Sequence, residues 1–322
     1  MKKIFFLLLA VLLLARQGLW HLAIPAFALA VLAKPQAGLL APLGVFALVR
    51  DVMQNKPARK HAGIGLLLGL AVTAVIVLPF SPNQDSIFWI VDKYVETLSS
   101  YAYATLSTGN LMFLLGGNWT PNEQVLFGGV TYGLLGTVLM VLSFAFGIFV
   151  YLRGKDRKHL FLASAVTMQL VFVLGSKMHE RYILPALVLL LLAYIETGDV
   201  RLLLSSLIAS AASAVNIGAV LAFEHLVAPN LWLGYMIGVF QLIAAGLSVW
   251  AAVSLSMGRE PMRLKPRAKK TKQREETQEN DAPSVLEARM REELLHPKDY
   301  KLHMKRADWI VMLGLTLLYG VV

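Results

Sequence analysis

The sequence predicts an all-α protein, a polytopic transmembrane helical bundle of about nine to ten helices. Of its 322 residues 57% are hydrophobic and only 16% are charged, and the mean hydropathy is +0.62, which is too apolar for an ordinary soluble domain. Apolar runs recur along the chain, and Lys and Arg gather in the segments between them, as the positive-inside rule expects. We therefore expect a multi-pass protein of the cell membrane, with the lipid bilayer as a partner.

Charge and composition exclude several classes of function. The formal net charge of +10 reflects membrane topology, so no nucleic-acid partner is expected. The chain has no cysteine, which excludes disulfides, thiolate catalysis and cysteine-ligated metals. The sequence motifs of nucleotide hydrolysis, hydride transfer, zinc proteolysis and serine hydrolysis are missing. We expect no cofactor and no metal, and any substrate should be a preactivated molecule reachable from the membrane.

Ten apolar runs give the expected helices or part-helices. They fall at about 4–15, 19–33, 37–49, 62–80, 125–151, 159–174, 182–195, 201–223, 231–257 and 308–322. A full crossing needs roughly 20 apolar residues, so the first run is short. We expect a transmembrane domain over 1–257 that is incomplete at its N-terminus, a basic cytoplasmic linker over 258–307, and the start of a further transmembrane helix over 308–322.

Basic residues between the runs predict the orientation. The segments 50–60 and 153–158 and the segment after 257 are strongly basic and should be cytoplasmic. Alternation then places four segments outside, namely 34–36, 81–124, 176–181 and 224–230. The N-terminal Met1-Lys2-Lys3 is the one exception to the rule, and a truncated first helix would explain it.

Two segments outside the apolar runs have helical patterns of their own. The outer segment predicts a helix over Ser86–Tyr103 that lies along the membrane, with its aromatic residues at headgroup level. The linker predicts a short amphipathic helix around Val285–Leu295. The basic part of the linker could bind anionic lipid at about 1 kcal/mol per charge; the alternative is a disordered topological anchor.

The richest polar motif runs from Ser176 to Tyr182, in a very short connection between two apolar runs. Charge at membrane depth costs roughly 2.5–3.5 kcal/mol, so such a cluster usually has a function. Lys177, His179 and Arg181 could bind an anionic phosphate, Arg181 through a bidentate fork, while Glu180 could orient His179 or hold a substrate hydroxyl. The alternative is a polar turn whose side chains snorkel to the interface.

The second motif is Lys34-Pro35-Gln36, which interrupts an apolar stretch from 19 to 49. Proline after lysine breaks or sharply turns a helix. Lys34 could be another cation for the phosphate and Gln36 a polar group of the same site, since both motifs are predicted on one side of the membrane. The alternative is an ordinary loop with one snorkelling lysine.

The third motif is the segment Ser107–Thr120, rich in Gly, Asn and aromatic residues. Its Asn110 and Trp119 are of residue types that contact sugars, although a structural loop tip is the alternative. Asn118-Trp119-Thr120 also fits an N-glycosylation sequon, a match that is frequent by chance.

Together these residues resemble a known family. The resemblance rests on Ala33-Lys34-Pro35-Gln36 before 39–43, Asn110 with 114–119, and Met178-His179-Glu180-Arg181-Tyr182 with 184–186. They resemble the bacterial GPI-mannosyltransferase-like membrane proteins, which belong to the type C glycosyltransferases and are broadly similar to the protein O-mannosyltransferases of glycosyltransferase family 39. The likeness covers about residues 10–255.

The resemblance implies transfer of a hexose, with mannose the expected sugar, from a polyprenyl phosphate to a glycan, lipid or protein acceptor on the outer face. Lys34, Lys177, His179 and Arg181 would bind the donor phosphate, and electrostatic stabilisation of that leaving group can be worth several kcal/mol. Gln36, Asn110, Trp119, Glu180 and Tyr182 would contact substrate.

The family's general base is an acidic residue in a first outer loop, which this chain lacks. The catalytic residues are therefore unassigned, and whether this chain alone is an active enzyme is left open. Two other interpretations stand beside it: a transporter or flippase for a lipid-linked sugar, and a non-catalytic membrane scaffold that acts through its basic segment.

Overall fold

A computed structural model describes residues 2–84, 86, 88–99, 101–154, 159–223 and 231–263. These residues belong to one compact unit within 1–265. The expected amphipathic helix at 285–295, the apolar run at 308–322 and the linker beyond Arg263 lie outside the described residues.

The first part of the chain forms a group of helices broken by proline. Its elements are α1 (Lys2–Arg16), α2 (Trp20–Ala33), the 3-10 helix η1 (Pro35–Leu40), α3 (Ala41–Gln54), α4 (Lys56–Val77) and the 3-10 helix η2 (Leu78–Phe80). Pro35, at the start of η1, forces the chain out of α2, since proline offers no backbone N–H to continue it. A β-carbon at Gly65 would lie 2.4 Å from the Trp20 carbonyl oxygen, so this glycine permits the close packing of α4 on α2.

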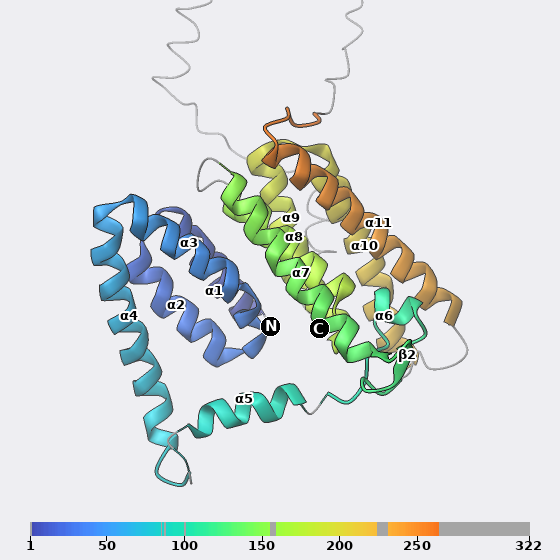
Figure 1. The fold of residues 1–322 in the computed structure, drawn as a ribbon, viewed down its shortest axis with the longest axis horizontal. Helices are drawn as coiled ribbons and strands as arrows, with labels where there is room; N and C mark the ends of the chain where they lie inside the picture. The colour runs from blue at the N-terminus through green and yellow to red at the C-terminus, as the bar shows by residue number, and fades with distance from the viewer. Residues whose placement is uncertain are drawn as a thin grey trace, which may run out of the picture. The chain divides into compact units, whose positions relative to one another are not determined.

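A segment of short helices and strands follows. It contains α5 (Trp89–Ser99), β1 (Thr105–Leu106), α6 (Leu111–Leu114), β2 (Val125–Phe127) and β3 (Val130–Thr131). Figure 1 shows α5 running crosswise to α4, with α6 and β2 at the same end of the helices. The predicted helix over Ser86–Tyr103 is thus shorter than expected, and Tyr101 and Tyr103 lie beyond it in the approach to β1.

The predicted apolar run at 125–151 is wrong at its start, because residues 125–131 form the hairpin of β2 and β3. Gly128 and Gly129 both have positive φ, a conformation that glycine adopts without steric cost. A Gly-Gly pair between apolar residues is a known hairpin signal, which the hydrophobicity of the run obscured.

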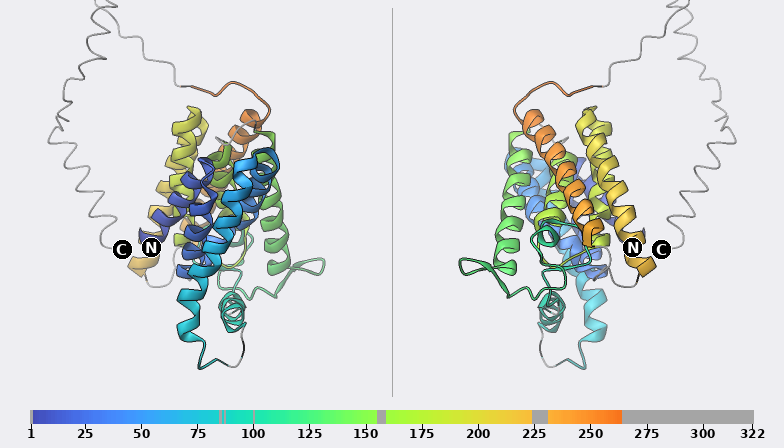
Figure 2. Two further views of the ribbon diagram at one scale, coloured as in Figure 1. Left: turned by 90° about the vertical axis from the view of Figure 1, so that its left-hand side faces the viewer. Right: turned by 90° about the vertical axis from the view of Figure 1, so that its right-hand side faces the viewer.

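The last part of the described chain packs around one central helix. Its elements are α7 (Tyr132–Arg153), α8 (His159–Leu174), β4 (Met178–His179), the 3-10 helix η3 (Glu180–Ile183), α9 (Leu184–Thr197), α10 (Val200–Phe223) and α11 (Leu231–Ser256). Residues 160–173 of α8 are all buried, because α7, α9 and α11 contact it from different sides. Figure 2 shows α10 and α11 side by side at one edge of this group, with α7 at another.

Among the described residues, five helical segments are long and apolar enough to cross a membrane: 35–54, 56–80, 132–153, 200–222 and 231–256. The helix α8, with 16 residues, is about 24 Å long at about 1.5 Å per residue, short of a hydrocarbon core of about 30 Å. The helical architecture is the one predicted, whereas the count of nine to ten crossings is not confirmed.

Strand β1 brings three distant segments together. It pairs in parallel with β4, so that Thr105 lies opposite Met178 and Leu106 opposite His179. On its other side Thr105 forms an isolated bridge with Asn118. The two polar motifs around His179 and Trp119 are therefore neighbours in space, separated by a single strand.

Candidate functional site

The Lys34 and His179 motifs meet at the side chain of Tyr182. The Gln36 amide donates a hydrogen bond of 3.0 Å to the Tyr182 hydroxyl, across 146 residues of sequence. The Lys34 ammonium nitrogen lies 5.5 Å from the centroid of the Tyr182 ring, within cation–π distance. Lys34 itself is extended (φ −158°, ψ 118°) and ends α2, so the helix break predicted at Lys34-Pro35 is what brings these two side chains to Tyr182.

His179 and Tyr101 complete the surroundings of Tyr182. The His179 ring lies edge-on to both Tyr101 and Tyr182, with centroids 5.2 Å apart in each case. The hydroxyl oxygens of Tyr101 and Tyr182 are 3.4 Å apart. We name the group Lys34, Gln36, Tyr101, His179, Arg181 and Tyr182 the Tyr182 cluster. Sequence reasoning missed Tyr101, because it assigned this residue to the interfacial helix.

Positive charge is crowded in the Tyr182 cluster. Burial, and then the charge of Arg181, lowers the pKa of Lys34. Burial is also the main cause that lowers the pKa of His179; Glu180 acts to raise it, and Arg181 and Lys34 act to lower it. His179 is therefore neutral at pH 7. Because the ionised form of Lys34 is disfavoured here, an anion bound beside it would relieve the repulsion from Arg181.

Tyr182 itself stays protonated throughout the physiological range. Burial, followed by the neighbouring Tyr101, raises the pKa of Tyr182 to about 12. Its hydroxyl accepts from Gln36 and so keeps its own proton for donation, either to Tyr101 or to a bound ligand. Arg181, one residue earlier on η3, is exposed, so its guanidinium is accessible to a ligand.

Asn110 has a structural role in this arrangement. It is fully buried, and its amide donates to the carbonyl oxygens of Phe172 and Gly175 at 3.3 and 3.1 Å. Its side-chain oxygen accepts from the Phe113 N–H and caps α6. Both polar atoms of Asn110 are thus engaged inside the fold, and we leave it out of the proposed site.

The Trp119 ring is exposed at the surface, but its indole N–H is held by a hydrogen bond. Its indole N–H donates to the Ser107 hydroxyl at 3.1 Å, and its ring packs edge-on to Tyr103 with centroids 5.3 Å apart. About 37% of its surface is accessible. The neighbouring Asn118, in the sequon-like triplet, uses its side-chain oxygen to accept from the Ser107 N–H.

Backbone strain is concentrated around β1. In the described part of the chain the non-glycine residues with positive φ are Ser107 (49°), Trp119 (55°) and Lys177 (60°). Lys177 adjoins the Tyr182 cluster and donates its backbone N–H to the Ala104 carbonyl at 2.7 Å. Left-handed conformations cost about 1–3 kcal/mol at such residues and persist where the surroundings fix them, often at functional sites.

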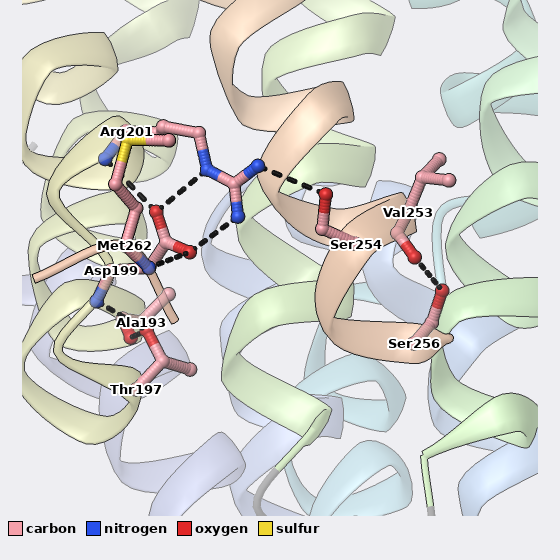
Figure 3. A network of polar contacts seen from close by, with 8 residues as sticks. All are labelled: Ala193, Thr197, Asp199, Arg201, Val253, Ser254, Ser256 and Met262. Carbon is pink, nitrogen blue, oxygen red and sulfur yellow. Dashed lines mark hydrogen bonds and ion pairs between the residues drawn. The ribbon is translucent and has the colours of Figure 1, made fainter. Parts of the chain in front are cut away.

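A second charged group, which the sequence did not predict, lies at the junction of α9 and α10 (Figure 3). Arg201 forms a bidentate pair with Asp199, with Nε 2.9 Å from Oδ1 and Nη2 2.6 Å from Oδ2. Arg201 also donates to the Ser254 hydroxyl, and the Met262 N–H donates to Asp199 at 3.2 Å. We name these four residues the Asp199 clasp. It fastens the segment after α11 to the start of α10.

The ion pair of the Asp199 clasp is buried and electrostatically balanced. Asp199 is 0% and Arg201 4% exposed, and the guanidinium lies 4.8 Å from the centroid of the Trp250 ring. Burial alone would raise the pKa of Asp199, but hydrogen bonds from Arg201 and from Met262, with the Arg201 charge, hold it below its ordinary value. The ionised form of Asp199 is therefore favoured, and the clasp has the features of a structural ion pair.

No protein-family model and no curated protein matched this chain. The geometry of the Tyr182 cluster, taken with the sequence motifs that form it, is therefore the basis for the function inferred below.

Proposed function

We propose that this chain is part of a membrane glycosyltransferase that binds a polyprenyl-phosphate-linked hexose, with mannose the expected sugar, at the Tyr182 cluster. The hexose is transferred to an acceptor on the outer face of the membrane. The observation that supports this best is the meeting of Lys34 and Gln36 with Tyr182, next to His179 and Arg181. These residues belong to two of the three motifs on which the resemblance to the type C glycosyltransferases rests.

The Tyr182 cluster offers the positive charges and hydrogen-bond donors that would bind a phosphodiester. Lys34 contributes a compact ammonium, and Arg181 a planar fork suited to two phosphate oxygens. The neutral His179 and the Tyr182 hydroxyl add uncharged hydrogen-bond donors next to them. Because the positive charges repel each other when no ligand is bound, the anion gains affinity from relieving that repulsion as well as from its own contacts.

Transfer then follows from the chemistry of the donor. The acceptor hydroxyl oxygen bonds to the anomeric carbon while the bond from that carbon to the phosphate oxygen breaks. The leaving polyprenyl phosphate keeps the electron pair, and the cations of the cluster stabilise its developing charge. The hydroxyl proton passes to a general base, which the resemblance assigns to an acidic residue of a first outer loop.

The competing interpretation, a transporter or flippase for a lipid-linked sugar, would use polar groups along a path through the spans. A set of polar side chains within α8, α10 and α11 instead bond to one another. Gln169 donates to the Ser205 hydroxyl at 3.1 Å and accepts from Ser248 at 2.6 Å. These bonds between helices favour a role in helix packing.

Binding of radiolabelled polyprenyl-phosphomannose to the chain in lipid nanodiscs tests the proposal without requiring turnover. We expect Lys34→Gln and Arg181→Gln each to weaken binding about 10- to 100-fold, since a hydrogen bond to a charged group contributes about 1.5–3 kcal/mol.

The matched controls are Lys93→Gln and Arg259→Gln, at exposed residues outside the cluster, which should leave affinity within about twofold. Unchanged affinity in both cluster variants would exclude this phosphate site. Movement of labelled donor between the leaflets of vesicles would favour the transporter instead.

A further inference from the structure

We propose that the acceptor of this reaction is a saccharide, held on the exposed ring of Trp119 beside Tyr103. This inference rests on the proposed function and narrows it, because glycan, lipid and protein hydroxyls are all possible acceptors from the sequence. We name Tyr103 and Trp119 the aromatic subsite.

The aromatic subsite continues directly from the Tyr182 cluster. Tyr101 contacts His179, and Tyr103 contacts Trp119. The two tyrosines are two residues apart, the spacing that puts side chains on one face of an extended chain. Thr105 pairs with Met178 on one side and bridges Asn118 on the other, so the backbones that hold His179 and Trp119 are about two strand spacings, about 10 Å, apart. A donor sugar above His179 and an acceptor ring on Trp119 would thus be adjacent.

The backbone conformation around Trp119 shows that its position is enforced. Trp119 and Ser107 both have positive φ, and the indole N–H of the one donates to the hydroxyl of the other. Buried Asn216 of α10 fixes Ser107 from behind, donating to its carbonyl at 2.7 Å. The same amide accepts from the Gly109 N–H at 2.9 Å. The strain is therefore held by the fold, as expected for a pre-organised binding group.

The orientation of the indole selects the chemistry of its ligand. Its single hydrogen-bond donor is directed at Ser107, so a ligand meets the ring through its carbon surface. About 37% of the surface of the residue is accessible. Sugar rings present C–H faces that pack on aromatic rings and hydroxyls that can reach neighbouring polar groups. In a tryptophan that anchors a protein at the membrane interface the indole N–H faces the polar side, whereas that of Trp119 is bonded to Ser107.

The test uses the full chain in nanodiscs and a panel of soluble oligosaccharides that includes mannotriose, with affinity measured by saturation-transfer NMR titration. We expect Trp119→Ala to weaken saccharide binding about tenfold and Trp119→Phe to keep it within about threefold, because phenylalanine retains an aromatic face. Trp232→Ala is the matched control, since Trp232 is 61% exposed on α11; it should bind like the unmodified chain.

The outcomes separate this inference from the proposed function. If Lys34→Gln and Arg181→Gln lose donor binding while Trp119→Ala binds saccharide normally, the aromatic subsite is wrong and the donor site stands. If the donor variants bind normally, the proposed function fails whatever Trp119 does. Failure of every oligosaccharide to bind the unmodified chain would overturn the inference. The inference would also be overturned if Trp119→Ala left saccharide binding unchanged and altered only how the thermal stability of the chain differs between anionic and neutral lipid. That result would indicate an interfacial anchor.

Discussion

The Asp199 clasp and the Tyr182 cluster are built from similar side chains but balance their charges in opposite ways. In the clasp a carboxylate and a guanidinium meet in a bidentate pair, shielded from solvent. In the cluster Lys34 and Arg181 act on each other as like charges, and the contacts of Lys34 and Gln36 go to the ring and hydroxyl of Tyr182. One group is complete as it stands, and the other gains from an added anion.

The directions in which the pKa values of Asp199 and Lys34 are shifted reflect this difference between the two groups. The lowered pKa of Asp199 means that its ionised form is favoured in the folded protein. The lowered pKa of Lys34 means that its ionised form is disfavoured there. A group that stabilises its own charges holds the fold together, whereas a group that destabilises them is suited to bind a ligand of opposite charge.

Breaking the clasp should give the largest effect on stability. Asp199→Asn leaves the Arg201 guanidinium buried without a counter-charge, and losing one partner of a buried pair costs about 3–5 kcal/mol. We expect a loss of that size in the free energy of unfolding, measured by denaturant titration in detergent.

The control is Lys93→Gln, which breaks the exposed Lys93–Glu96 pair and should leave stability nearly unchanged. Replacing both partners of the clasp, as Asp199→Leu with Arg201→Met, should recover most of the loss, because no buried charge is then left unpaired. A single Asp199→Asn variant as stable as the unmodified chain would show that the clasp does not hold the fold.

The same kind of change in the Tyr182 cluster should leave stability nearly unaltered. Lys34→Gln removes a charge that Arg181 repels, so we expect the free energy of unfolding to stay within about 0.5 kcal/mol, on the stabilising side. Thermal unfolding of the ligand-free protein measures it, with Arg201→Gln from the clasp as the destabilised comparison. If Lys34→Gln proves as destabilising as Arg201→Gln, the cluster is a structural network and the comparison fails.

Sequence reasoning located the ingredients of the Tyr182 cluster because proline and charge are visible without a structure. The break at Lys34-Pro35 and the polar turn at His179 both lie where predicted. The bond from Gln36 to Tyr182 could not be predicted, since it depends on how α8 packs against η1 and η3. Tyr101 was missed for a related reason, because aromatic residues look alike in a helix and in the extended chain after one.

The clasp shows why other features escape sequence patterns altogether. Asp199 and Arg201 flank the start of an apolar run and read as ordinary boundary charges. Met262 takes part through its backbone N–H, and a backbone contact cannot be predicted from the type of residue. Asn110 shows the converse, since an asparagine that caps a helix cannot be told by sequence alone from one that contacts a sugar.

The smallest expected effect is in the pH dependence of stability, where the two regions act in separate windows. For Asp199 the folded pKa is lowered, so its stabilisation is complete above the ordinary value of about 3.9 and is lost as the pH falls through the folded pKa. For Lys34 the folded pKa is also lowered, so between that pKa and about 10.4 the unfolded chain binds more protons, and stability rises with pH. Tyr182 acts in the opposite direction: its folded pKa of about 12 lies above its ordinary value, so its contribution to stability falls as the pH rises above about 10.

Denaturant unfolding between acidic and alkaline pH should therefore show an acid limb that Asp199→Asn removes and a shallow alkaline rise that Lys34→Gln removes. Donor affinity should fall over the same alkaline window, as Lys34 loses its proton, and Lys34→Arg should abolish that fall because arginine stays charged. An alkaline rise that persists unchanged in Lys34→Gln would mean that another group is its source. The crowding of charge at the Tyr182 cluster would then not be the property that sets it apart from the clasp.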